Sequence, residues 1–503
     1  MTNSVRIRRD VTKMKAGPSG WDVNSDIFWY AHAVGVMMND YDEDPRSWRW
    51  QANIHGSGSP DPDSPPPKPN PDWNHCPHGG WFFLPWHRGY LYYFEDIVRS
   101  VVKKLGGPEN WALPYWNYTR VANHDPLNDA SKEFRKLPEA FRTPKIPHYA
   151  LGVEVDNPLY DMIKRNSTAN QGFGVAWELV NPTDAMRSLR YPGVRPDHFG
   201  SKDTGAELPH DKGDFGCLES VPHNKIHLFV GGWMGVFISP RDPIFWLHHA
   251  NIDRIWPAWL AKGGGRKNPE TEDWLLKPFT FWDRTAKKQT ISAKSMLDTE
   301  KQLGYKYEDL EVWEDPVKAE RKAVVLVAAN PGPTGQVLGT AGGGELGPEP
   351  VTVPVQPETS ATRALSSMAE AESARNGQRV VLTIRDVRAD ESPGTTFRVL
   401  LGADQDREAD LAPDSPYFVG HLDFFGAIGG DIHHHGGRGF DFSFDVTDQL
   451  RALREQGLWD GTSVPSVVLA PVPLEAPPEL AAALTVPPPG SRPRYGSVVL
   501  TNE

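Results

Sequence analysis

Residues 75–95 read HCPHGGWFFLPWHRGYLYYFE, and they place three histidines and one of the chain's two cysteines among closely spaced aromatic residues. A buried imidazole costs free energy unless it has a hydrogen-bond partner or a metal ion. From Trp86 to Leu105, apolar residues recur every three or four positions, which predicts an amphipathic helix. This stretch therefore predicts a helical domain that buries histidines in its interior.

Composition and charge narrow the class of protein. The chain has 503 residues and contains no apolar run of the roughly 20 residues that a membrane helix needs. Its net charge of −12 is spread without long blocks of like charge, which argues against nucleic acid or an anionic membrane as a partner. The N-terminus lacks a secretory signal, and two cysteines are too few for a disulfide framework. We therefore expect a cytoplasmic protein, whose oligomeric state the sequence does not predict.

Periodicity and composition divide the chain into two domains. Residues 22–260 are mostly helical in pattern, and the helix of DPIFWLHHANIDRIWPAWL has Asp242 as its expected N-cap and Pro243 as its first residue. Strand-like runs appear only near the C-terminus, at residues 379–389, 396–404, 439–447 and 463–472. Between the two regions the chain is poor in aromatics and rich in Gly, Pro, Ala and Ser, which is typical of a flexible linker.

These patterns predict a fold class and domain boundaries. We expect a mainly α chain, in which a helical-bundle catalytic domain is followed by a smaller β-sandwich. The boundaries expected are residues 1–327 for the catalytic domain, 328–376 for the linker and 377–503 for the sandwich. The exposed linker is where a protease should cut first.

Histidine spacing indicates metal binding in the first domain. His223 and His227 are four residues apart, so a helix would place both rings on one face, and a third candidate follows in FWLHH. An earlier trio consists of His55, His78 and His87. Any one of these histidines alone would more often be a hydrogen-bonded core residue, but two trios argue against coincidence. Three neutral imidazoles leave an open coordination position, and they suit copper, zinc, iron or nickel.

Longer sequence motifs favour one of these metals, copper. HGGWFFLPWHRGYLYYFE, followed by HNKIHLFVGG and DPIFWLHHANIDRIW, resembles the two copper-binding motifs of the tyrosinase family, which comprises tyrosinases, catechol oxidases and molluscan hemocyanins. QANIH, PYWNY and the LGYKY ending at Tyr307 most resemble plant polyphenol oxidases. FDVTDQLRALREQGLWDGTSVPSVVLAPV resembles the C-terminal domain of these plant enzymes. The resemblance implies a type-3 copper protein that binds O2 between two copper ions.

Carried over position by position, the resemblance implies two copper sites with three histidine ligands each. The ligands would be His55, His78 and His87 for the first copper, and His223, His227 and His249 for the second. His248 would then be a structural neighbour of the second site. Aromatic walls would exclude water and keep the imidazoles neutral, as copper ligands must be.

Further site residues follow from the same resemblance. Glu219 and Asn224 would hold a water that deprotonates incoming monophenols, although Glu219 has the alternative of being a solvated loop carboxylate. Phe237 would lie beside the second copper, where it would narrow the entrance and favour diphenols, or it would be an ordinary core residue. Asp253 would orient a ligand ring or pair with an arginine, and of these two roles we favour ring orientation.

Cys76 precedes His78 by two residues, a spacing at which fungal tyrosinases and molluscan hemocyanins carry a thioether to the histidine ring. We expect this thioether, and the alternatives are a free buried thiol or a disulfide with Cys217. The chain also departs from the plant pattern, because Ser59 stands where plant enzymes carry a cysteine and the plant N-terminal disulfides have no counterpart. His75 is expected to be a loop residue, and the HHH at 433–435 a polar turn.

The C-terminal domain is expected to be a lid. Plant polyphenol oxidases and hemocyanins place an apolar or aromatic side chain from this domain over the copper site. The aromatic candidates here are Tyr417, Phe418, Phe424 and Phe425, which would equally suit a sandwich core. The predicted function is O2-dependent oxidation of o-diphenols to o-quinones, with hydroxylation of monophenols, by an enzyme that is latent until the lid is displaced. The alternatives are oxidation of o-aminophenols, hemocyanin-like oxygen transport without turnover, and a metal-free binding module.

Overall fold

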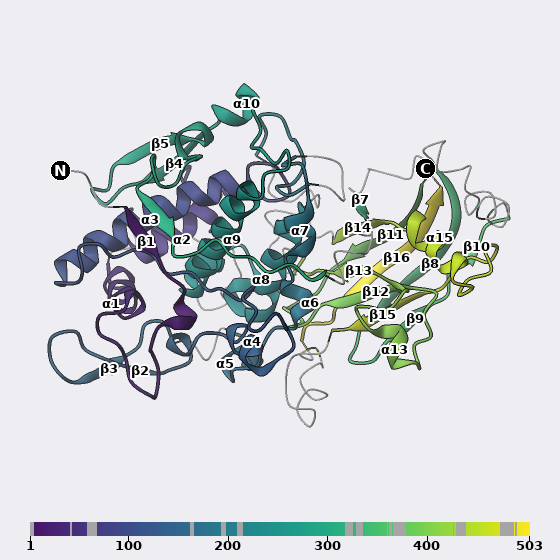
Figure 1. Cartoon of the computed structure of the whole chain (residues 1–503), viewed down its shortest axis with the longest axis horizontal. Coiled ribbons are helices and arrows are strands. Elements are labelled where there is room, and N and C mark those ends of the chain that lie inside the picture. The colour runs from purple at the N-terminus through teal and green to yellow at the C-terminus, as the bar shows by residue number, and fades with distance from the viewer. Residues whose placement is uncertain are drawn as a thin grey trace. The chain divides into compact units, whose positions relative to one another are not determined.

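The protein divides into two compact units (Figure 1). The first comprises Met1–Pro192 and Phe199–Glu314, and the second comprises Gly193–His198 and Asp315–Glu503. The computed structural model describes residues 5–40, 43–57, 68–160, 165–192, 198–208, 215–316, 325–327, 335–359, 361, 365, 379–425, 427–428, 439–472, 487 and 490–502.

Helices build the first unit. The main helices are α1 (Asp26–Met38), α2 (Trp48–His55), α3 (Phe83–Lys104), α8 (Lys225–Val230) and α9 (Ile244–Ala261). The shorter ones are α4 (Asp129–Phe134), α5 (Ser167–Asn170), α6 (Trp177–Val180), α7 (Thr183–Arg187) and α10 (Glu272–Leu275). The 22-residue α3 packs against both α1 and α9, and its buried side begins at Phe83 and continues to Val102 (Figure 1). The predicted helices of this unit are thus confirmed.

Local capping positions two of these helices. The Ser47 hydroxyl accepts a hydrogen bond from the Trp50 amide at 3.1 Å, which begins α2 so that it ends at His55. Asp242 caps α9 as predicted, because its carboxylate accepts from the Ile244 amide at 3.1 Å. Pro243 precedes the first residue of the helix rather than occupying it. Both caps fix where a histidine emerges from its helix.

His223 and His227, two of the predicted ligands, lie one helical turn apart. His223 belongs to η3 (Glu219–Asn224), a π-helical turn, and His227 belongs to α8, which follows it. The backbone is non-helical at Val221 (φ −140°, ψ 119°), before His223, whereas Asn224 and Lys225, which join η3 to α8, both have helical backbone. The predicted closeness of the two rings is confirmed, because their centroids are 4.6 Å apart. His78, by contrast, belongs to the loop before α3.

Three two-stranded sheets complete the first unit. β1 (Arg6–Arg8) pairs in parallel with β6 (Tyr305–Tyr307), so the beginning and the end of this unit lie side by side. β2 (Lys145–Pro147) and β3 (Glu154–Asp156) form one hairpin, and β4 (Pro278–Trp282) and β5 (Lys288–Ser292) form another. Among the residues that the structure describes, no helix is both long and apolar enough to cross a membrane.

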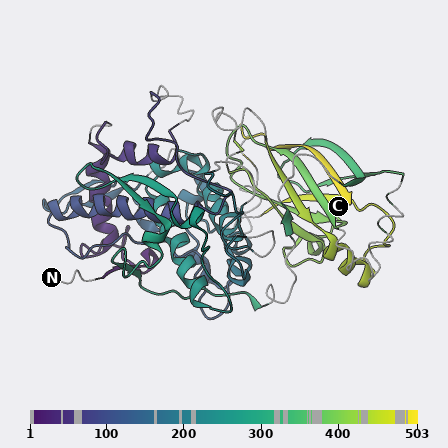
Figure 2. The same ribbon diagram turned by 90° about the horizontal axis from the view of Figure 1, so that it is seen from above.

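The second unit consists mainly of two antiparallel sheets. The larger has the order β10-β8-β16-β11-β14-β7, and the smaller has the order β13-β12-β15-β9. Their strands are β7 (Val325–Val327), β8 (Gln336–Glu345), β9 (Val351–Val353), β10 (Gln356–Pro357), β11 (Val380–Val387), β12 (Phe397–Leu401), β13 (Phe418–Leu422), β14 (Phe440–Asp445), β15 (Val467–Pro471) and β16 (Arg494–Asn502). The yellow strand β16 lies inside its sheet, between green neighbours (Figures 1 and 2). Two short helices, α13 (Glu408–Leu411) and α15 (Thr447–Glu455), accompany the sheets.

The two sheets face one another, as a sandwich requires. Gly420 in β13 leaves room for Phe444 in β14, because a Cβ at position 420 would lie 2.6 Å from the Phe444 ring. The core of the smaller sheet contains Leu400, Val468 and Ala470 together with Leu453 from α15. The predicted sandwich strands are present. The structure is 32% helix and 21% strand, so the expectation of a mainly α chain is not confirmed, and the fold combines a helical unit with a β unit.

Much of the predicted linker is folded. The residues of β8, β9 and β10 all lie between 328 and 376, and β7 pairs with β14, so the second unit takes up chain that was assigned to the linker and to the catalytic domain. The glycines of β8 misled the prediction. A Cβ at Gly343 would lie 2.4 Å from the carbonyl oxygen of Tyr495 in β16, so glycine is needed there for close approach of two strands rather than for flexibility.

Candidate metal centre

Four side chains converge in the first candidate site. His55 is the last residue of α2, His87 belongs to the first turns of α3, and Cys76 and His78 come from the loop between these helices. One potential ligand atom from each of the four lies within 4.8 Å of all the others. All four side chains are buried.

A second group of four lies beside it. His223 and His227 come from η3 and α8, and His248 and His249 from α9, with potential ligand atoms again within 4.8 Å of one another. The structure therefore brings all six predicted copper ligands into two clusters of three, and it adds Cys76 to the first cluster and His248 to the second.

Hydrogen bonds leave the Nε2 atom of four histidines as the nitrogen with a lone pair. In each case Nδ1 faces an oxygen that can only accept, so Nδ1 carries the proton. The pairs are His55 with Phe237 O (2.7 Å), His87 with Phe83 O (2.8 Å), His227 with Met234 O (2.6 Å) and His223 with Asn224 Oδ1 (2.8 Å). Ring orientation by an outer acceptor is typical of metal-bound histidine. The donor set thus fits a pair of nitrogen-ligated metal ions.

Burial also gives the rings the charge state that metal binding needs. It lowers the pKa of His223 to about 3, and it lowers the pKa of His87, His227 and His249 well below the usual range, with further lowering from neighbouring histidines. These imidazoles are therefore neutral at pH 7, with their lone pairs available. The Nε2 atoms of His227 and His249 lie 3.4 Å apart, and a cation between such lone pairs would relieve their repulsion.

The two clusters share walls. The rings of His87 and His249 stack with centroids 4.3 Å apart and planes 11° from parallel. Phe83 lies 4.6 Å from His87 and 4.7 Å from His223, and Phe245 lies 4.1 Å from His249 and 5.2 Å from His55. Each phenylalanine thus touches both clusters. We had not predicted these walls, although both occur as Phe-x-x-x-His, which puts the ring one helical turn before the histidine.

The adjacent His248 and His249 have different partners. His248 Nδ1 lies 2.9 Å from the Tyr118 hydroxyl, and neither His248 Nε2 nor His249 Nδ1 has a hydrogen-bond partner among the described residues. His249 faces His227 and stacks on His87, so it lies where the clusters meet. These contacts favour His249 as the ligand, with Tyr118 holding its neighbour.

The two predicted catalytic residues, Glu219 and Asn224, lie next to the histidine clusters. Glu219 is 1% exposed, and its carboxylate accepts from the Gly79 amide at 2.9 Å and from the Ser201 hydroxyl at 2.6 Å. It is therefore a buried, anchored group rather than a solvated loop carboxylate. The amide oxygen of Asn224 accepts from His223, as described above. Sequence reasoning missed Ser201, which no motif marks.

Phe237 is buried against the first cluster. Its ring lies 5.5 Å from His78 and 6.5 Å from His55, and its carbonyl oxygen accepts from His55 Nδ1. The prediction had placed this side chain beside the second copper. The reason for its position is the close approach of α2, because a Cβ on Gly56 would lie 2.4 Å from the Phe237 carbonyl oxygen.

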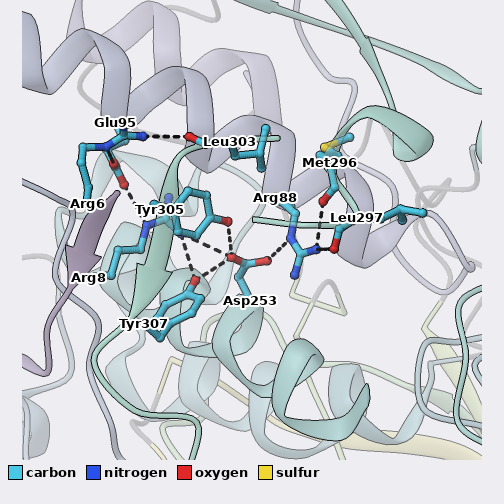
Figure 3. Close-up of polar contacts among 10 residues, drawn as sticks. All are labelled: Arg6, Arg8, Arg88, Glu95, Asp253, Met296, Leu297, Leu303, Tyr305 and Tyr307. Carbon is cyan, nitrogen blue, oxygen red and sulfur yellow. Dashed lines mark hydrogen bonds and ion pairs between the residues drawn. The ribbon is translucent and has the colours of Figure 1, made fainter. Parts of the chain in front are cut away.

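Asp253 does not orient a histidine ring, so that preferred interpretation is wrong. Its carboxylate accepts from Arg88 Nε at 2.6 Å and Arg8 at 3.3 Å, and from the hydroxyls of Tyr305 and Tyr307 at 2.7 and 2.6 Å (Figure 3). Burial alone would raise the pKa of Asp253, but the two arginines hold it below its usual value. Asp253 instead pairs with arginine, the other role that the sequence allowed. The reason is that β1 and β6 bring charged and phenolic side chains to the face of α9 that carries Asp253.

Cys76 is a buried thiol in this structure, and no disulfide joins it to Cys217. Its sulfur lies 3.6 Å from Nδ1 and 3.8 Å from Nε2 of His78, and 3.3 Å from Nε2 of His87. Nearly equal distances to both nitrogens of His78 suit a sulfur that faces the ring carbon between them. Burial raises the pKa of the thiol well above its usual range.

The structure describes only some of the remaining predicted positions. Ser59 and residues 433–435 lie outside the described residues. His75 is exposed in a loop, as expected, with its Nε2 2.8 Å from the Pro71 carbonyl oxygen. Of the aromatic lid candidates, Tyr417 belongs to the core of the smaller sheet and Phe424 lies 6.0 Å from Phe397 within the sandwich. Phe418 is half-buried and Phe425 is buried.

Comparison with known proteins identifies the family. The common central domain of tyrosinase matches residues 45–262, and the polyphenol oxidase middle domain matches residues 268–315. Tyrosinase HcTyr1 of Hahella sp. (strain CCB-MM4) is 31% identical over 471 residues, which cover 90% of this chain and 94% of HcTyr1. The chain belongs to the tyrosinase family. As a member of this family, it is a copper oxidoreductase of the type-3 phenol oxidase class.

Plant members of the tyrosinase family are also similar. The chloroplastic polyphenol oxidase of Malus domestica is 29% identical, and the aligned region covers 59% of this chain and 49% of the apple protein, so this chain spans about half of that relative. Residues 341–478 match a domain of unknown function, DUF7868. The structure of latent apple tyrosinase has a TM-score of 0.56 at 22% identity, covering 99% of this chain and 97% of that one. That likeness shows a shared fold.

Proposed function

We propose that this tyrosinase-family enzyme uses O2 to oxidise o-diphenols to o-quinones and also hydroxylates monophenols. The two clusters would hold one copper each, through His55, His78 and His87 and through His223, His227 and His249. Bound copper would supply O2 binding and the two-electron redox chemistry. The observation that carries the proposal is the buried carboxylate of Glu219, which lies between the loop of His78 and the turn of His223.

Glu219 supports the monophenol step. A monophenol must lose its proton before it can bind a metal ion as a phenolate, and a carboxylate beside the metal is a suitable acceptor, directly or through a water. Hydrogen bonds from the Gly79 amide and the Ser201 hydroxyl hold the Glu219 carboxylate next to the His78 loop, where it could receive that proton. The phenylalanine walls would exclude bulk water and stack on a flat phenolic ring.

Phe237 supports a preference among phenols. Its ring stands beside His78 and His55, so it would meet the substrate from the side of the first copper. We therefore propose that it limits the bulk of the phenol rather than the reaction type.

Initial rates of O2 uptake and of quinone formation, with catechol, tyrosine and o-aminophenol as separate substrates, test the proposal. With copper in excess so that both sites are loaded, Glu219→Gln should lower turnover of tyrosine by about 100-fold, while catechol turnover falls much less, because only the monophenol must lose its proton before it binds. Equal losses for both substrates would refute the role of Glu219. Reversible O2 binding without quinone formation would indicate an oxygen carrier, and faster turnover of o-aminophenol than of catechol would favour that alternative.

A further inference from the structure

Ser201 is a buried residue with an uncommon backbone conformation. Its φ of 74° lies in the left-handed region, which residues with a Cβ rarely adopt because it costs free energy. The residue is completely buried, in the loop that follows Phe199. Such a residue persists where its surroundings require it, so its contacts indicate what it does.

The hydroxyl of Ser201 accepts one hydrogen bond and donates another. The Gly216 amide donates to Ser201 Oγ at 2.7 Å, and an amide N–H cannot accept. The hydroxyl proton is therefore directed to Glu219 Oε2, 2.6 Å away. Gly216 is needed for this approach, because a Cβ there would lie 2.3 Å from the Ser201 amide nitrogen.

Glu219 in turn joins the two copper clusters. Its other oxygen, Oε1, accepts from the amide of Gly79, the residue directly after His78 of the first cluster. Glu219 itself begins η3, the turn that carries His223 of the second cluster. The chain Gly216–Ser201–Glu219–Gly79 consists wholly of buried hydrogen bonds. These hydrogen bonds form a bridge from the loop of Gly216, through Glu219 in the turn that carries His223, to the loop that carries His78.

We propose that Ser201 is a positioning residue, whose hydroxyl fixes the Glu219 carboxylate so that it holds the His78 loop against the second copper cluster. The inference deepens the proposed function, because it concerns the same pair of copper sites. The left-handed backbone of Ser201 is the conformation that presents its hydroxyl to Glu219 while its oxygen faces Gly216. The energetic cost of that backbone is offset by the bridge.

Two substitutions separate the hydroxyl from the backbone. Ser201→Ala removes the hydroxyl and keeps the strained φ, whereas Ser201→Gly removes the hydroxyl and relieves the strain, since glycine adopts this φ freely. We expect Ser201→Gly to have the higher melting temperature of the two, and both variants to bind one of their two coppers about tenfold more weakly than the wild type, as loss of an outer partner of a ligand does. Copper retention is measured by competition with a chelator, and it does not depend on turnover.

Ser131→Ala is the matched control. Ser131, in α4, is also completely buried, and its hydroxyl donates to the Asp125 carbonyl at 2.7 Å and accepts from the Ala122 amide at 2.8 Å. Neither α4 nor the loop before it carries a cluster histidine. Ser131→Ala should lose stability and keep both coppers. If its copper affinity falls as much as that of the Ser201 variants, or if either Ser201 variant retains wild-type copper affinity, the proposal is wrong.

A double-mutant cycle tests the route through Glu219. Glu219→Gln should weaken copper binding, and Ser201→Ala should add little to it, because both changes break the same bridge. Additive losses would overturn the bridge while leaving the copper sites in place. A wild-type protein that binds fewer than two coppers would instead overturn the proposed function, so the two failures are distinguishable.

Discussion

Arg88 donates from Nε to Asp253 Oδ1 at 2.6 Å, and this ion pair joins the two helices that carry stacked histidines of different clusters. Arg88 follows His87 on α3, and Asp253 lies one turn after His249 on α9. Both side chains are at most 2% exposed. The Arg88–Asp253 pair (Figure 3) therefore sets the spacing of α3 and α9 next to the stack of His87 and His249.

Asp253→Asn should destabilise the protein by about 3 kcal/mol, because it leaves two buried guanidinium groups without their shared charge. The free energy of unfolding in urea, on copper-free protein, measures this loss. Asp96→Asn is the control, since Asp96 pairs with Arg284, whose side chain is 58% exposed, and it should cost less than about 1 kcal/mol. Similar costs for the two variants would show that the buried pair does not fasten the helices.

His87→Ala and His227→Ala should each lose about one copper per chain and nearly all oxidase activity, because each leaves two imidazoles at a site with three. Elemental analysis after dialysis, together with catechol oxidation, measures both. His75→Ala, in an exposed loop, should keep two coppers. His248→Ala should also keep two coppers if His249 is the ligand. Full copper content in His87→Ala would refute the assignment of the first site.

Cys76 and His78 should be joined by a thioether after the protein has been loaded with copper and exposed to O2. The sulfur lies 3.6 Å from Nδ1 and 3.8 Å from Nε2 of the ring, so bond formation needs little movement. The bond removes two hydrogen atoms, and peptide mass spectrometry should find residues 76 and 78 crosslinked with a loss that survives reductant. Cys76→Ala is the control that cannot form the bond. A loss reversed by reductant would mean a disulfide.

Asp26 should make the protein less stable as the pH rises from about 4 to 6. Burial raises the pKa of this carboxyl from 3.8 to about 6 although Arg9 lies 2.8 Å away. The folded state therefore holds a proton that the unfolded chain releases at lower pH, so stability is greatest below the unfolded pKa and is lost as the pH passes the folded one. Relative to the wild type, Asp26→Asn should gain stability as the pH rises across this range, and the gain should be at most about 3 kcal/mol. A difference that does not change with pH would contradict this prediction.

Full-length protein should be latent. We predict that cleavage at a specific protease site inserted after Glu314, where the first unit ends, raises diphenol turnover several-fold. The site is placed there, and not within residues 336–357, because these form strands of the second unit. The same site inserted at the exposed tip of the β2–β3 hairpin, near Gly152, controls for the insertion. Equal rates before and after complete cleavage would refute the lid.

Local patterns predicted the helices and the histidine clusters well. The four-residue spacing of His223 and His227 and the hydrogen bond from the Ile244 amide to Asp242 both act over one helical turn, so the sequence contains the whole cause. The role of Asp253 depends on its contacts with Arg8 and Tyr305, which are more than 50 residues away along the chain. The period of a helix or strand does not predict contacts over such a separation. Ser201 was missed because its partners Gly216 and Glu219 lie 15 and 18 residues further along the chain, which no helix or strand period connects to it.

The linker was mispredicted because glycine has two physical uses. In β8 it permits close contact with the neighbouring strand, as at Gly343, whereas in a turn it permits a positive φ, as at Gly79. Composition alone does not distinguish these uses, since the partner strand β16 is about 150 residues further along the sequence. The sandwich strands with alternating apolar residues carried their own signal and were predicted.

The position of β16 determines when the second unit can be completed during synthesis. Residues 494–502 pair with β8 on one side and β11 on the other, so the larger sheet stays in two halves until these residues leave the ribosome. By then the first unit, which ends at Glu314, has been free to fold and to acquire metal. The order of translation thus gives the copper clusters a period of assembly before the second unit is finished.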